Sequence, residues 1–252
     1  MADVGSLVGT AVGVATAFSS ALRKRDIPEI ITKSQGQATI KNEPNDWRVK
    51  IHLPPVLNDM NSKLFAPLKD SDNAMVFPLT PSIIIQHSAN YNALQPTHTN
   101  YAYQVYQNSS IETITVTGEF IVETKADAAY WLATTHFLRS ATKMFFGEGE
   151  NAGNPPVICK LSGYGDYVFN KMPCVIQNFT IDLPQDVDYI SSDVGVNVAE
   201  APSKQPQSYA PASSQITVSL VPVYSRETIE KFTLKDFVTG GYLGNADTKG
   251  FI

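Results

Sequence analysis

The feature that most constrains this chain is an alternating strand that leads directly into one long helix, within Ser110–Gly147. From Glu112 to Glu123 the sequence reads E-T-I-T-V-T-G-E-F-I-V-E. Alternation of this length predicts a strand with one face on a core and the other face in water. The predicted core face carries Ile114, Val116, Phe120 and Val122. The predicted wet face carries Thr113, Thr115, Thr117 and Glu119.

The helix that follows has a recognisable start. Thr124 and Asp127 have the spacing of a capping box, with Asp in place of the usual Glu. We expect the helix to run to Phe146, with Gly147 as its C′ residue. One apolar stripe is expected to face the helix's own core. It comprises Tyr130, Thr134, Phe137, Ala141 and Met144.

The predicted helix is apolar over too much of its circumference. Trp131, Leu132 and Leu138 fall on the flank and on the polar side, where a simple surface helix would carry Lys or Glu. One interpretation is a helix sunk into a crowded single domain. The other is a helix whose second face meets another subunit, because large exposed apolar patches usually mark partners. We favour the second and predict that these three residues form a subunit interface.

The composition and charge of the chain favour a globular protein with partners and argue against a nucleic-acid-binding protein. The chain has 252 residues, of which 43% are hydrophobic and 17% charged, with a net charge of −5. It is therefore globular and less charged than average, which suits a protein that buries surface against partners. The only basic cluster is Arg23-Lys24-Arg25, which argues against tight nucleic-acid binding through phosphates. A protein that lets DNA pass without gripping it remains allowed.

The two cysteines lie in apolar segments with strand-like patterns. If the turn between them centres on Tyr164-Gly165, the residue facing Cys159 is near position 170. Cys174 would then lie about four residues, or roughly 13 Å, further along the strand, which is too far for a disulfide. We therefore predict free buried thiols in a reducing compartment.

The N-terminal part of the chain divides into two predicted regions. Residues 1–25 form an apolar arm or helix of small residues, with Asp3 before the apolar run and positive charges after it. That charge order argues against a signal peptide, and the many Gly, Ser and Thr residues make a membrane span less favourable than an arm packed in an assembly. Residues 26–74 are rich in proline and predicted to be irregular and β-rich.

The remaining residues, 75–252, are predicted to form one domain of short strands around the helix. A strand that begins at Tyr101 is expected to pair with the Glu112 strand across a turn at Asn108-Ser109-Ser110. A further hairpin joins Val157–Ser162 to Tyr167–Met172. Residues 191–214 are rich in Ser, Pro, Ala and Gln and are predicted to be a flexible insertion. The segment from Gln215 to Tyr224 alternates again and predicts another strand.

The sequence contains no motif that supports an enzyme. No phosphate loop, dinucleotide fingerprint, HExxH or CxxC occurs, and the four histidines have no metal-ligand spacing. Glu123 and Asp127 could be imagined as paired catalytic carboxylates, but helix capping explains them better. We expect no catalytic residue, no metal and no cofactor.

Several segments together resemble a known family. The strand I-T-V-T-G-E-F and the helix A-A-Y-W-L-A-T-T-H-F-L-R-S-A-T-K-M-F-F-G are the first two. The later segments are P-P-V-I-C-K-L-S-G-Y-G, M-P-C-V-I-Q-N-F-T-I-D-L-P-Q-D-V-D-Y-I and V-S-L-V-P-V-Y-S-R. In this order they resemble contractile-tailed phage baseplate proteins at the base of the tail tube, of the tube-initiator or tube-cap type. The resemblance spans roughly residues 75–252.

This resemblance implies a tail-tube fold, mainly β, in which an antiparallel sandwich or barrel carries one long flanking helix. It implies a hexameric ring whose inner strands join around a channel that DNA passes without specific binding. The implied partners are the tail-tube protein and the baseplate hub, and contact with the tape-measure protein stays open. The implied location is the virion, with assembly in the host cytoplasm and no stable membrane association. The wet face of Thr113, Thr115, Thr117 and Glu119 is our candidate for the channel lining.

Two alternative functions are kept. The chain could be the repeating tube subunit or another hub ring, which copy number in the particle would distinguish. It could also be a carbohydrate-binding or lytic β-sandwich module, in which Tyr101, Tyr103 and Tyr106 form a stacking platform.

Overall fold

The computed structural model describes most of the chain after its N-terminal region. The described residues are 46–59, 63–147, 151–165, 167–192, 208–244 and 250–251. The chain divides into two compact units, residues 1–37 and 38–252, and all described residues belong to the second unit. The predicted arm at residues 1–25 and the predicted region 26–45 therefore lie outside the described residues.

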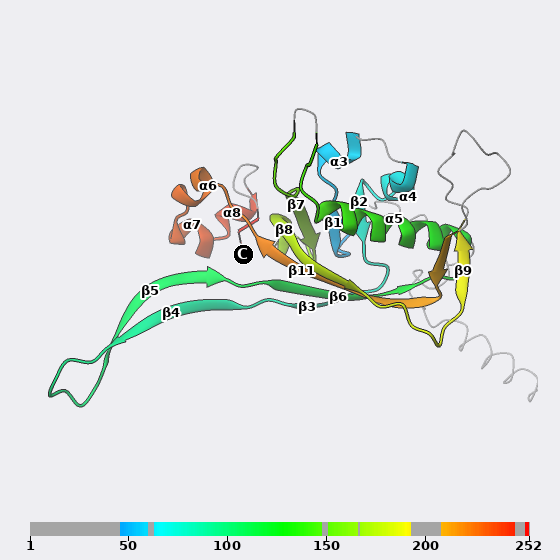
Figure 1. Cartoon of the computed structure of the whole chain (residues 1–252). Coiled ribbons are helices and arrows are strands. Elements are labelled where there is room, and N and C mark those ends of the chain that lie inside the picture. The colour runs from blue at the N-terminus through cyan, green and yellow to red at the C-terminus, as the bar shows by residue number, and fades with distance from the viewer. Residues whose placement is uncertain are drawn as a thin grey trace, which may run out of the picture. The chain divides into compact units, whose positions relative to one another are not determined.

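The second unit is built on one seven-stranded antiparallel sheet (Figure 1). Its strands occur in the spatial order β2-β1-β7-β8-β11-β6-β3. In chain order they are β1 (Lys50–His52), β2 (Ala74–Val76), β3 (Ser82–Ile84), β6 (Ile114–Ile121), β7 (Cys159–Gly163), β8 (Phe169–Ile181) and β11 (Ser213–Pro222). Two two-stranded ribbons complete the strands: β4 (His87–Leu94) with β5 (Tyr103–Ile111), and β9 (Tyr189–Ser192) with β10 (Ser208–Pro211).

The part of the chain that the structure describes is thus mainly β with one long helix, as predicted. The described strands form a single open sheet and two ribbons, where we expected two stacked sheets or a barrel. Strands β1 and β2 belong to the same sheet as the later strands, so the predicted boundary between residues 74 and 75 is not a domain boundary. Strands β9 and β10 lie at the two ends of the predicted insertion 191–214, and its residues 193–207 lie outside the described residues.

The long helix α5 (Lys125–Ala141) packs on one face of the sheet (Figure 1). Thr124 is its N-cap, and Thr124 and Asp127 form the predicted capping box. The helix ends five residues before Phe146 with Thr142 as its C-cap, so the prediction of Gly147 as C′ residue is wrong. The other helices among the described residues are short: α3 (Pro55–Asp59), the 3₁₀ helix η1 (Lys63–Phe65), α4 (Ala66–Lys69), α6 (Arg226–Glu230), α7 (Leu234–Val238) and α8 (Gly241–Gly244).

The core lies between the sheet and α5. The predicted inner face of β6 is confirmed, because Ile114, Val116 and Phe120 are buried. Gly118 interrupts this row because the ring of Phe77 fills its place. A Cβ at Gly118 would lie 2.3 Å from Cδ1 of Phe77. The same ring packs edge-on against Phe120, with 5.7 Å between the centroids.

Two predicted strand pairings are corrected. No turn occurs at residues 108–110, because β5 runs through them and pairs with β4. The loop of that hairpin is instead at residues 95–102. In the β7–β8 hairpin, Cys159 lies directly opposite Cys174. The pairing centres near residue 166, two residues later than the turn we assumed, so the distance argument against their contact is wrong.

Candidate interaction surfaces

Two of the three residues predicted to form a subunit interface are buried within one copy. Trp131 and Leu138 lie two turns apart on α5 and are 6% and 0% exposed. The indole Nε1–H of Trp131 donates to Oγ of Ser214 at 2.8 Å. The prediction that these two residues meet another subunit is therefore wrong, because the chain itself covers them. Leu132 is half-buried and packs against the same core.

The covering elements come from distant parts of the chain. Helix α5 contacts η1 and α4 on one flank and the β9–β10 ribbon on the other, in addition to the sheet. Phe65 of η1, for example, packs against the ring of His136 with 5.4 Å between centroids. A helix surrounded in this way needs apolar residues on most of its circumference. The excess of apolar residues on α5 is explained within one copy.

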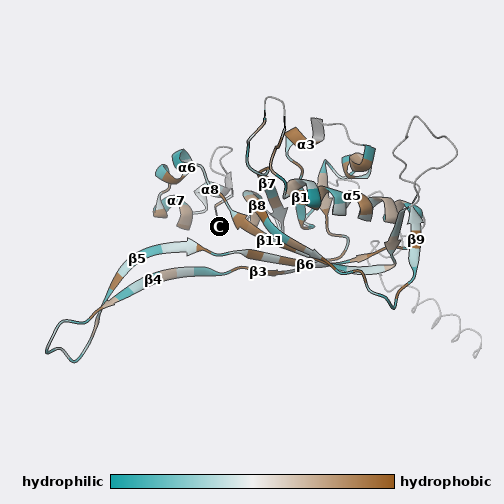
Figure 2. Cartoon of the chain, viewed as in Figure 1, coloured by the Kyte–Doolittle hydropathy of each residue, from teal (hydrophilic) through white to brown (hydrophobic). Residues whose placement is uncertain are grey.

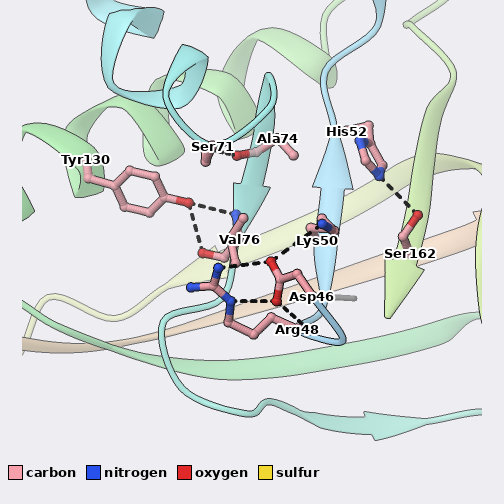
Figure 3. A network of polar contacts seen from close by, with 9 residues as sticks. All are labelled: Asp46, Arg48, Lys50, His52, Ser71, Ala74, Val76, Tyr130 and Ser162. Atoms are coloured by element: carbon pink, nitrogen blue, oxygen red, sulfur yellow. Dashed lines mark hydrogen bonds and ion pairs between the residues drawn. The ribbon is translucent and has the colours of Figure 1, made fainter. Parts of the chain in front are cut away.

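The β2 edge of the sheet is closed by side chains (Figure 3). The hydroxyl of Tyr130 accepts from the backbone N–H of Val76 at 2.7 Å and donates to the carbonyl of the same residue at 2.9 Å. The hydroxyl of Ser71 donates to the carbonyl of Ala74 at 2.6 Å. These bonds occupy the outward-facing N–H of Val76 and the outward-facing carbonyls of Ala74 and Val76, which disfavours the addition of a further strand there. Burial raises the pKa of Tyr130 to about 12, which keeps this hydroxyl protonated.

A second polar group anchors the start of β1 in the same region (Figure 3). The guanidinium of Arg48 donates to both carboxylate oxygens of Asp46, at 2.8 and 2.9 Å, and Lys50 lies 3.5 Å from the same carboxylate. Burial alone would raise the pKa of Asp46, but the bonds from Arg48 outweigh it and lower the pKa below 3.8. On β1, burial and the nearby charge of Lys50 lower the pKa of His52 to about 4. Asp46, Arg48 and Lys50 thus form an ion cluster at the start of β1, and Nε2 of His52 lies 3.0 Å from Oγ of Ser162 on β7.

The opposite edge of the sheet is open. Strand β3 is the edge strand and pairs with β6 only over Ser82–Ile84. Ile84 and Ile85 are 63% and 40% exposed there. Among the described residues, no strand pairs with the outer side of β3. Natural edges are usually protected by charged residues or proline, and an exposed apolar edge is a template for another strand.

The β4–β5 ribbon continues this edge beyond the sheet (Figure 1). The N–H of Glu112 donates to the carbonyl of Gln86 at 2.9 Å, which joins the β3–β6 ladder to the β4–β5 ladder. Nearly every residue of both strands is exposed, on both faces. An isolated two-stranded hairpin is at best marginally stable in water. Because its residues are exposed on both faces, the ribbon has no packing partner among the described residues.

The two faces of the ribbon differ in chemistry. On one face, Asn90 donates to Asn108 at 3.0 Å, and apolar side chains of Leu94 and Val105 lie nearer the tip. On the other face, Tyr91 packs edge-on against Tyr106 with 5.7 Å between centroids. Figure 2 shows the resulting mixture of hydrophilic and hydrophobic residues along both strands.

The sequence holds a signal for this ribbon that strand periodicity does not show. Between Asp72 and Glu112 there is no Asp, Glu, Lys or Arg, although 17% of the whole chain is charged. Exposed strands usually carry charges that prevent edge-to-edge association. An exposed ribbon without any of these charges can lie against an identical ribbon without like-charge repulsion.

The predicted channel-facing residues lie together on the outer face of the sheet. Thr113, Thr115 and Thr117 are half-buried and Glu119 is exposed. Their partners are also polar: Thr117 Oγ1 lies 3.2 Å from Thr217 Oγ1, and Ser213 donates to Glu119 at 3.1 Å. This face of β6 and β11 is a band of hydroxyl and amide groups with few charges. The predicted wet face of the strand is confirmed, and its place in a channel stays a prediction.

The proposed tyrosine platform is not a single surface. Tyr103 and Tyr106 are an odd number of residues apart in a regular part of β5 and face opposite sides of the ribbon. Tyr101 lies in the loop and is 86% exposed. A sugar ring stacks on aromatic side chains that share one surface, so this arrangement gives no support to the carbohydrate-binding alternative.

Comparisons with known proteins add no identification. No protein-family model matches the chain, and a search of curated proteins found no similar sequence. Within the described ranges, no group of His, Cys, Asp and Glu could hold a metal ion. None of the helices described is long and apolar enough to cross a membrane.

Proposed function

We propose that this chain is a ring-forming structural protein of a contractile phage baseplate that templates polymerisation of the tail tube. The observation that carries the proposal is the β4–β5 ribbon, which is exposed on both faces, uncharged and continuous with an open sheet edge. The resemblance of residues 75–252 to tube-initiator and tube-cap proteins supplies the context. The finer expectation of a tail-tube fold belongs to the same proposal.

The ribbon suggests how a ring would form. If ribbons of neighbouring copies point the same way around an axis, the outer edge of β4 in one copy faces the outer edge of β5 in the next. Strand β4 runs towards the tip and β5 runs back, so the two facing strands are antiparallel and their backbones can pair. Such a contact uses two different edges of each copy, which is a heterologous contact that closes when the rotation allows. Six copies would form the expected hexameric ring.

The two edges of the sheet differ in whether another strand can pair with them. The β2 edge is closed by Tyr130 and Ser71, whereas the β3 edge and the ribbon are open. Growth by strand addition would therefore occur only on the open side. The uncharged polar band of Thr115, Thr117 and Thr217 suits a channel lining, because it has no positively charged side chain that would bind the phosphates of DNA. The proposed partners are the tail-tube protein, the hub and further copies of this chain.

A seeding experiment tests the proposal. Purified chain is added to tail-tube subunits at a concentration where they polymerise slowly, and tube growth is followed by light scattering and electron microscopy. We expect the lag phase to shorten and each tube to carry one ring of this protein at its base. A variant in which a two-residue turn replaces residues 87–111 should fold and fail to seed. The proposal is wrong if the intact protein leaves the lag phase unchanged.

Copy number separates this proposal from its nearest alternative. An initiator is present as one ring per particle, whereas a repeating tube subunit is present as many rings. Quantitative mass spectrometry of purified particles against the hub protein measures the ratio. A large excess over the hub would favour the tube subunit.

A further inference from the structure

The β7–β8 hairpin brings the two cysteines of the chain face to face. Cys159 of β7 and Cys174 of β8 are direct register partners, and both side chains lie on the core face of the sheet. Both are 0% exposed, and both are free thiols. The sequence contains no other cysteine, so each is the only partner of the other within one copy.

The type of strand pair sets their separation. The carbonyl of Pro173 accepts from the N–H of Val223 at 3.0 Å, and therefore points away from β7. Pro173 and its partner Lys160 thus form a non-hydrogen-bonded pair across β7 and β8. Pairs alternate along an antiparallel ladder, so the next pair, Cys159–Cys174, is a hydrogen-bonded one, with its Cα atoms about 5.5 Å apart. That Cα separation is typical of disulfides. The Cβ atoms of a hydrogen-bonded pair lie about 5.5 Å apart, so they must approach by about 1 Å when the bond forms.

The surroundings keep the thiols unreactive while the hairpin is closed. Burial raises the pKa of Cys159 to about 12. Burial also raises the pKa of Cys174, and the nearby Cys159 raises it further. The attacking species in disulfide exchange is the thiolate, and it is almost absent at neutral pH under these conditions. An oxidant also has no access to side chains that are fully buried.

We propose that Cys159 and Cys174 are a latent cross-strand disulfide, formed when the β7–β8 hairpin opens in the presence of a small-molecule disulfide. On opening, one cysteine thiolate attacks the small disulfide, forms a mixed disulfide and releases one small thiol. The second cysteine thiolate then attacks the cysteine sulfur of the mixed disulfide and releases the second small thiol. The two cysteines together lose two electrons and two protons, and the small disulfide is reduced to two thiols.

The bond would connect β7 directly to β8. It constrains a loop of about 15 residues in the unfolded chain, which stabilises the native state. In this proposal the chain folds with both thiols reduced. The disulfide forms later, when the hairpin opens, and then fixes the hairpin. This inference is independent of the proposed assembly role.

The test uses the full chain with oxidised glutathione in two conditions. In native buffer we expect both thiols to stay unmodified. In urea below the unfolding midpoint, we expect the intact mass to fall by two hydrogens and peptide mapping to find a Cys159–Cys174 cross-link. After removal of urea, the oxidised chain should have a Tm higher by roughly 5 °C or more. A reducing agent should reverse the shift.

Single variants provide the controls. Cys159→Ala and Cys174→Ala, each checked for folding by circular dichroism, should each take up one glutathione in urea and form no internal bond. Stable glutathione adducts on both cysteines of the native sequence would overturn the proposal. So would disulfide-linked dimers as the main product, or an internal bond that prevents refolding. Oxidation as fast in native buffer as in urea would contradict the requirement for opening.

Discussion

Helix α5 and the β4–β5 ribbon are both rich in large apolar and aromatic residues, but these residues are buried in the helix and exposed in the ribbon. Trp131 and Leu138 of α5 are buried by the sheet, η1, α4 and the β9–β10 ribbon. Tyr103 and Leu94 of the ribbon are 62% and 60% exposed. The helix is therefore complete within one copy, whereas the ribbon is not. An apolar residue marks a partner surface only when the rest of the chain leaves it uncovered.

The largest expected effect tests the helix side of this comparison. Replacing Trp131 by Ala removes a buried ring and leaves the hydroxyl of Ser214 without its donor. We expect the free energy of unfolding to fall by about 3–5 kcal/mol, measured by urea denaturation of the isolated chain. Tyr101→Ala on the ribbon loop is the control and should change it by less than about 0.5 kcal/mol. Equal effects of the two variants would remove the distinction between the regions.

The closed edge of the sheet gives a smaller effect. Tyr130→Phe leaves the backbone N–H and carbonyl of Val76 buried without their partner. The expected loss is about 1–3 kcal/mol, the usual result of leaving buried polar groups unsatisfied. Tyr103→Phe removes a hydroxyl from the ribbon and should have no measurable effect on unfolding. An unchanged stability of Tyr130→Phe would show that the hydroxyl does not close the edge.

The pH dependence of stability reports on β1. Burial lowers the pKa of His52 to about 4 in the folded chain, against 6.5 in the unfolded chain. The unfolded state therefore binds the proton first as the pH falls, so stability decreases between about pH 6.5 and pH 4 and His52 contributes no further loss below that. The loss from this group is at most about 3 kcal/mol and smaller to the extent that solvent screens a half-buried site.

His52→Gln separates this effect from the carboxylates. The variant should have a flatter stability profile between pH 6.5 and pH 4 in urea denaturation. Asp46, whose pKa is lowered, should still cause a loss of stability below about pH 4. A profile in His52→Gln identical to that of the native sequence would contradict the assignment.

The smallest effect on stability is expected on the ribbon, together with a large effect on assembly. Asn92→Lys places a charge on an exposed strand and should leave the free energy of unfolding within about 0.5 kcal/mol of the native value. A lysine on an edge blocks pairing with another strand, so ring formation should be lost. Gln185→Lys adds the same charge on an exposed loop and is the control. Native-like rings of Asn92→Lys in electron micrographs would show that the ribbon does not join copies.

The local patterns in the sequence predicted local structure well. The alternation of Ile114, Val116 and Phe120 gave the correct inner face of β6, and Thr124 with Asp127 gave the correct start of α5. Both depend on neighbouring residues only. The burial of Trp131 depends on residues 63–69, 189–192 and 208–214, which return to cover the helix. Periodicity along α5 contains no information about them. The predicted registers of the two hairpins were wrong for a related reason. The position of a turn decides which residues face each other, and both turns were placed wrongly.

Strand periodicity did not predict the ribbon as an interaction surface, although the sequence contains a signal for it. Its strands alternate weakly because both faces are exposed, so the usual contrast between core and solvent is absent. The lack of charge between Asp72 and Glu112 was the usable signal. A long uncharged stretch with exposed tyrosines supports the proposal that sister copies cover this surface.

Hydrogen exchange of the ribbon amides, in the isolated chain and in purified assembled particles, tests the central claim most directly. The backbone amides of residues 87–111 should exchange rapidly in the isolated chain and become strongly protected in the assembled ring. The amides of α5 should be protected in both and serve as the internal reference. Rapid exchange of the ribbon in both states would contradict the account, because it would show that no sister copy covers these strands.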